Sequence, residues 1–222
     1  MEIHKPKPVH SWREFLTEIG TITLGVLIAL AAEQAVEWLH WQSEVKVARV
    51  ALHAEIAADN AIFLTRRVAI APCLERQAQE AGRILDDLEA KRPPGRFTTF
   101  HPENGSLLSF NEWESERAAQ TLTHFPREEL ALIGRYYEQL ADDKNWMLNE
   151  TNAWHELSVL RHPPSEIGIS DILRLRAALE DAEEDEGLVV QNVRRQLSWS
   201  GQLGIAAKPY DPARLAQYCK PA

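Results

Sequence analysis

The sequence predicts an all-α protein in which one apolar helix near the N-terminus continues into a bundle of about three long helices and one short helix. Apolar residues recur at helical spacing through most of the chain. One segment near the N-terminus is uncharged, and no segment alternates apolar and polar residues long enough to indicate a strand. The expected divisions are an N-terminal tail (1–17), a transmembrane helix (18–39), a helical bundle domain (40–204) and a C-terminal tail (205–222).

The composition is typical of one globular domain with an appendage. Of 222 residues, 45% are hydrophobic and 26% are charged. The 33 acidic and 24 basic side chains give a formal charge of -9, which repels a phosphate backbone, and the basic residues form no dense cluster. We therefore expect no nucleic-acid partner.

The uncharged segment covers residues 19–32 and reads IGTITLGVLIALAA. As a helix it would be about 21 Å long, shorter than the ~30 Å hydrocarbon layer of a bilayer. Its flanks extend it, because Trp12 and Trp38 would lie about 39 Å apart, close to the ~40 Å between headgroup layers. Indole rings favour those layers, so Trp12, Trp38 and Trp41 are the expected membrane-interface anchors and the lipid bilayer is an expected partner.

Two other interpretations fit the length of this segment. A cleavable signal peptide would use Ala29-Leu30-Ala31 as its cleavage motif. The positive charge that such a peptide needs is cancelled by Glu2, Glu14 and Glu18. A core helix of a soluble protein would need a polar face, and residues 22–31 offer only the hydroxyl of Thr23. The sequence favours a membrane span over both.

Small residues recur on one side of the expected span. Residues of this kind let two helix backbones approach closely in lipid, so this face is a candidate for association with a second copy or another membrane protein. The face consists of Glu18, Thr21, Gly25, Ala29 and Ala32. Lys5, Lys7 and Arg13 precede the span, which predicts a cytoplasmic N-terminus and a periplasmic bundle at the inner membrane.

The stretch WREFLTEIGTITLGVLIALAAEQAVEWLHW resembles the opening of a family of small single-pass bacterial membrane proteins of unknown function. FNEWESERAAQTL and IGRYYEQL resemble the tryptophan and tyrosine helices that follow in that family. The resemblance implies membrane attachment and a helical domain, and it implies no catalytic residue.

The first half of the bundle is expected to begin with a long helix from Glu33 to about Lys91, with a kink or break near residues 69–72 at Pro72. A loop rich in Pro, Gly, Thr and Asn follows to about Gly105. Ser109 and Glu112 have the spacing of a capping box for a short helix to about Leu122. The expected buried residues of the long helix are Val45, Leu52, Ile56, Phe63, Ile84, Leu85 and Leu88.

The second half contains two more helices. Pro126 opens one of them, which ends before Pro163-Pro164, and Ser170 is the expected N-cap of the last, which closes near Gly201–Gly204. The PYDP motif beyond it indicates an extended tail. The buried stripes are expected at Leu130, Ile133, Tyr137, Leu140, Met147, Trp154 and Leu157, and at Ile172, Leu175, Leu179, Val189, Val193 and Leu197.

Cys73 and Cys219 lie far apart and outside any C-x-x-C spacing. Two unpaired buried thiols are the expected state, with a single disulfide as the alternative in an oxidising compartment.

No catalytic or metal motif is complete. His155-Glu156 begins like HExxH, but Val159 stands where the second histidine is needed, so we expect no metal and no cofactor. The acidic block at residues 180–186 is interpreted as a solvated helix face or a frayed turn, with a cation site or a basic partner as alternatives. The aromatic residues Trp113, Tyr136, Tyr137, Trp146 and Trp154 are interpreted as core, or alternatively as the lining of a pocket.

The sequence therefore predicts a membrane-anchored helical protein that is not an enzyme and acts as an interaction or accessory subunit. A periplasmic ligand-sensing bundle and an uncharacterised hydrolase are the two alternatives.

Overall fold

The structure is a computed structural model that describes residues 11–97 and 108–219. The chain divides into two compact units, residues 1–47 and residues 48–222. Every regular element of the described residues is helical, which confirms the all-α class. About three long helices and one short helix were expected, whereas the described residues form four α-helices of 25 residues or more and two short ones.

Helix α1 (Trp12–Asp59) belongs to both units, and it begins at Trp12 rather than at residue 18. A single π-helical turn (Asn60–Leu64) joins it to α2 (Thr65–Glu89). The sequence predicted a kink or a short break near residues 69–72, and a break is wrong, because α2 continues through Pro72. The proline removes one backbone donor, and its neighbours Ile70 and Leu74 are fixed in the core, so the helix tolerates the loss.

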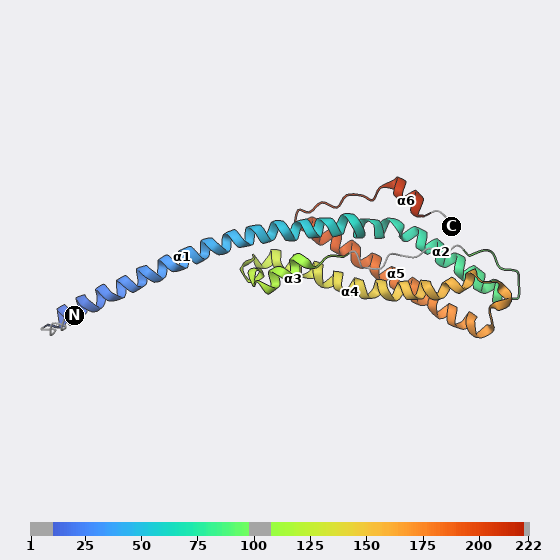
Figure 1. Ribbon diagram of the computed structural model, residues 1–222, viewed down its shortest axis with the longest axis horizontal. Coiled ribbons are helices and arrows are strands. Elements are labelled where there is room, and N and C mark those ends of the chain that lie inside the picture. The colour runs from blue at the N-terminus through green and yellow to red at the C-terminus, as the bar shows by residue number, and fades with distance from the viewer. Residues whose placement is uncertain (1–10, 98–107, 220–222) are drawn as a thin grey trace, which may run out of the picture. The chain divides into compact units, whose positions relative to one another are not determined.

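The remaining helices of the second unit are α3 (Asn111–Ala118), α4 (Arg127–Leu157), α5 (Ile169–Gln202) and α6 (Pro212–Tyr218). Short 3₁₀ turns lie at Thr121–His124, Ser158–Arg161 and Pro164–Glu166. The α4–α5 pair is an antiparallel hairpin, and α5 also packs against α2 (Figure 1). Helix α6 lies against α2.

The apolar core lies between α2, α4 and α5. Leu85, Trp154 and Leu175 come from these three helices and are 0–1% exposed. Most of the positions selected by helical spacing are buried, and the exceptions Leu88, Leu130 and Leu197 are half-buried. Spacing of apolar residues therefore located the packed faces of all three long helices.

Both predicted N-caps are corrected. Helix α3 begins after Phe110, and the Ser109 hydroxyl does not bond within its own helix but donates to Glu55. Helix α5 begins one residue before Ser170, after Gly168, whose N–H donates to the Asp171 carboxylate. At the start of each helix, backbone N–H groups donate to a carboxylate that sequence spacing did not single out. This carboxylate is Glu55 for α3 and Asp171 for α5.

The C-terminal region is also corrected. Helix α5 ends near Gly204, whose φ of 79° is the left-handed conformation that favours glycine after a helix, as predicted. The following residues are not only an extended tail, because Asp211 accepts a hydrogen bond from the N–H of Ala213 and starts α6. In the predicted loop, residues 92–97 are non-helical, and residues 98–105 lie outside the described residues.

Candidate functional site

Helix α1 is long and apolar enough to cross a membrane. No residue of its most apolar 18-residue window is buried. Large side chains such as Leu24, Leu27 and Ile28 are more than half exposed. An apolar helical window in which no residue is buried is typical of a lipid-exposed segment.

The predicted association face lies on one side of this helix and is open. Glu18, Thr21, Gly25, Ala29 and Ala32 are all exposed. A Cβ atom added at Gly25 would meet nothing within 4 Å. The Thr21 hydroxyl donates to the Thr17 carbonyl at 2.8 Å, so its polar group is satisfied inside the helix. The association of this face stays a prediction.

The predicted interface tryptophans differ in exposure. Trp12 is 71% exposed and its ring lies 5.4 Å from that of Phe15. Trp38 is 60% exposed, whereas Trp41 is half-buried and its ring lies 5.3 Å from that of His40. Their role as membrane anchors stays a prediction.

The second unit buries polar groups that sequence spacing did not single out, and Glu55 is the first. Its carboxylate accepts hydrogen bonds from the Tyr137 hydroxyl at 2.7 Å and the Ser109 hydroxyl at 2.5 Å. It also accepts from the backbone N–H groups of Glu112 and Trp113, at 3.2 and 3.3 Å. Burial opposes ionisation, but these four hydrogen bonds outweigh it and lower the pKa of Glu55. An ionised Glu55 therefore caps α3 from α1.

One helical turn further along, Asp59 and Asn60 form a second buried group at the π turn. The Asp59 carboxylate accepts from the Ser109 N–H at 3.1 Å, and burial together with the nearby Glu55 charge raises its pKa to about 7. The Asn60 amide donates to the Ser200 hydroxyl at 2.9 Å and accepts from the Tyr136 hydroxyl at 3.2 Å. These bonds join the π turn to α4 and α5.

Arg67 is the centre of a third buried group. Its side chain is 1% exposed, and one guanidinium nitrogen pairs with both Glu150 of α4 and Glu186 of α5. Burial raises the pKa of Glu186 to about 8, although Arg67 opposes this shift. Near neutral pH Glu186 is therefore largely protonated, and its carboxyl group lies against the Arg67 guanidinium.

Two more carboxyl groups lie in the same bundle. Asp143 is fully buried and accepts from the Asn192 amide at 2.8 Å, yet burial raises its pKa to about 7. Asp185 is 6% exposed. Burial raises the pKa of Asp185 to about 6, and the nearby charges of Glu150, Asp181 and Glu184 add to this shift. The acidic block is therefore not uniformly solvated as expected, because Asp185 and Glu186 face the interior of the bundle.

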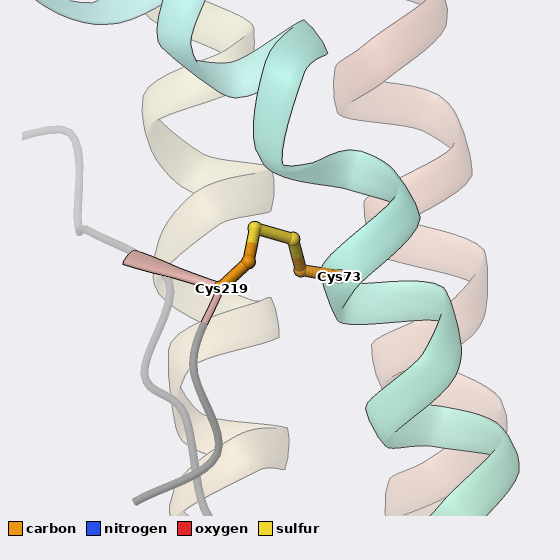
Figure 2. The surroundings of a disulfide bond; sticks show 2 residues. All are labelled: Cys73 and Cys219. Carbon is orange, nitrogen blue, oxygen red and sulfur yellow. A yellow bond between two sulfur atoms is a disulfide. The ribbon is translucent and has the colours of Figure 1, made fainter. Parts of the chain in front are cut away.

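Cys73 and Cys219 form a disulfide, which corrects the expectation of two unpaired thiols (Figure 2). Their Cα atoms are 5.6 Å apart, within the usual range for a disulfide, although 146 positions separate them in sequence. The bond attaches α6 to α2, and Leu215 of α6 packs against the apolar core. Sequence distance alone could not show this proximity.

The polar groups of this interior bond to one another and to the ends of helices. Within residues 11–97 and 108–219, no group of three or more metal-ligating side chains gathers in one place. The aromatic residues do not line one pocket: Trp113 stacks on Tyr137 at 5.0 Å, Trp154 lies in the core and Trp146 is exposed. The buried carboxylates accept from side chains and helix ends, as groups that fix helix packing do.

Comparisons with known proteins yield no matching family model, and no curated protein and no solved structure shows significant similarity to the chain.

Proposed function

We propose that the protein is a single-pass membrane protein that holds a disulfide-bonded helical domain on the periplasmic side of a bacterial inner membrane, where the domain acts as an interaction or accessory subunit. The observation that carries this proposal is the complete exposure of the most apolar window of α1. In water such a surface would aggregate, whereas in a bilayer it lies in its preferred solvent.

Two independent features support the same orientation. Basic residues precede the apolar segment, at Lys5, Lys7 and Arg13, which favours a cytoplasmic N-terminus. The Cys73–Cys219 disulfide persists in an oxidising compartment and would be reduced in a cytosol. Both features support a location outside the cytoplasm for the domain that follows the span.

The location is tested in intact cells and in spheroplasts. We expect the chain to resist carbonate extraction, and we expect protease added to spheroplasts to degrade residues 48–222. A maleimide polymer should modify the denatured chain only after reduction, and a Cys73→Ser/Cys219→Ser control should never be modified. Release by carbonate would contradict the span, and modification without reduction would contradict the periplasmic location.

The partner surface in the membrane is proposed to be the face that contains Gly25 and Ala29. Leucine at both positions would separate two closely packed helices, so Gly25→Leu/Ala29→Leu should abolish crosslinked dimers or heteromers. The matched control is Thr23→Leu/Ala31→Leu, which adds similar bulk on the opposite side of the helix. Equal crosslinking by both variants, or only monomer from the unaltered chain, would refute association through this face.

A further inference from the structure

A concave pocket lies at the end of the bundle where α2 stops and α4 turns back into α5. Its volume is about 650 Å³, within the range of small-molecule sites in proteins. One side is formed by α2 and residues 94–97, and the other by the α4–α5 connection at residues 160–167. We call it the Phe97 pocket.

The floor of the Phe97 pocket is apolar. Ile84, Phe97 and Leu160 are 4–5% exposed and continue the core, while the partly buried Leu88 and Ile167 lie beside them. An apolar floor of this kind gains free energy when an apolar ligand displaces water from it.

Proline residues lie on both sides of the Phe97 pocket. Pro94 lies on one side, and Pro163 and Pro164 lie on the other, where a 3₁₀ turn (Pro164–Glu166) follows. A fixed φ at each proline limits the backbone movement of both walls. A ligand would therefore bind to a pocket that is already formed, with little loss of conformational entropy.

The charged residues of the lining are all basic or potentially basic. Arg96 and Arg161 are exposed at the rim, and His162 lies next to Arg161. None of the described residues that line the pocket carries a carboxylate, although the chain has a formal charge of -9. Beside the pocket, the Glu166 carboxylate lies 3.7 Å from the Nδ1 atom of His162.

From this arrangement we infer that the Phe97 pocket binds a small amphiphile with an apolar body and a carboxylate head. The body would lie on the floor of Ile84, Phe97 and Leu160, and the head would pair with Arg96 and Arg161 at the rim. Guanidinium groups match a carboxylate in charge and in planar geometry. This inference does not depend on the membrane location, and it would make the domain a ligand-binding module.

The test uses the full-length protein reconstituted in nanodiscs of phosphatidylcholine, with empty nanodiscs as the blank. Octanoate is the probe, octanol has the same tail without the charge, and acetate has the head without the tail. We expect saturable octanoate binding that is at least tenfold tighter than that of either octanol or acetate. A diazirine analogue of octanoate should label peptides that contain Phe97 or Leu160.

Arg96→Ala/Arg161→Ala should weaken octanoate binding at least tenfold and leave octanol binding unchanged. Arg117→Ala/Arg135→Ala removes two exposed arginines elsewhere and should bind like the unaltered chain. Melting by circular dichroism should show that both variants are folded, because all four side chains are exposed.

Three results would overturn the inference. Octanoate binding that does not saturate would show that no site exists. Labelling confined to α1 would place the probe in the bilayer. Equal loss in the two double variants would show that net charge governs binding, and no loss in either would show that Arg96 and Arg161 do not bind the carboxylate.

Discussion

Residues 12–40 and the bundle that follows them distribute their side chains in opposite ways. The first segment exposes its apolar residues, including Leu24 and Leu27, and has no core of its own. The bundle has an apolar core but also buries Arg67, Glu150 and Asp143 at 0–1% exposure. Exposed apolar residues are typical of a segment that lies in lipid, whereas buried charges need partners fixed by tertiary structure, so we expect the two segments to depend on different surroundings.

The buried ion group should give the largest effect. Arg67→Met would leave Glu150 in the core without its cation, which costs about 3–5 kcal/mol for a broken buried pair. Urea unfolding of the full chain in detergent, followed by circular dichroism, measures this loss.

The control for Arg67 is Arg176→Met, which removes an arginine that is one-third exposed and pairs with Asp86 and Glu89. It should cost less than about 1 kcal/mol, because solvent screens such a pair. Replacing Arg67, Glu150 and Glu186 together by methionine should recover most of the stability. Similar losses of unfolding free energy at Arg67 and Arg176 would show that burial does not determine how much these ion pairs stabilise the fold.

A charge placed on the apolar segment tests the other half of the comparison. Leu27→Arg puts a guanidinium near the centre of the proposed span, which costs about 3 kcal/mol of insertion free energy. We expect less protein in the membrane fraction and unchanged melting of the protein that remains there.

Val47→Arg is the matched control, since Val47 is as exposed as Leu27 but lies beyond the proposed span. It should leave the membrane fraction unchanged. If both arginines reduce insertion equally, or neither does, residues 18–39 are not a lipid-spanning segment.

Protonation should give the smallest effect. The pKa of Asp59 is raised to about 7, so its contribution to stability is complete below about pH 4 and is lost as pH rises through 7. Between pH 5.5 and 8 this carboxyl alone should cost the fold about 1–2 kcal/mol. Asp143 and Glu186 act in the same direction, because burial also raises their pKa values, to about 7 and about 8.

Asp59→Asn keeps the oxygen that accepts from Ser109 and cannot ionise, so its stability should fall less between pH 5.5 and 8 than that of the unaltered chain. Chemical unfolding at the two pH values measures this difference. Glu138→Gln, at an exposed position of α4, should retain the full dependence on pH. If the stability of Asp59→Asn depends on pH as strongly as that of the unaltered chain, Asp59 is not the source of the dependence.

Helical spacing was sufficient to predict the packed faces, because buried apolar residues recur every three to four positions along each long helix. Leu52, Tyr137 and Val189 are examples from three different helices. It could not predict partners that come from different helices, such as Glu55 with Tyr137 or Cys73 with Cys219. One signal was present, since Arg67 lies between the apolar residues Leu64 and Ile70 on a helix. A charge at that position indicates a buried partner, which the acidic block supplies through Glu186.

The start of α3 depends on a carboxylate from α1, and this has a consequence for the order of folding. The α4–α5 hairpin connects neighbouring segments and can form early, whereas the bond from Ser109 to Glu55 closes a loop of more than fifty residues. We expect α3 to become helical only after residues 48–59 have docked. Ser109→Ala should then accelerate unfolding and leave the rate of refolding nearly unchanged.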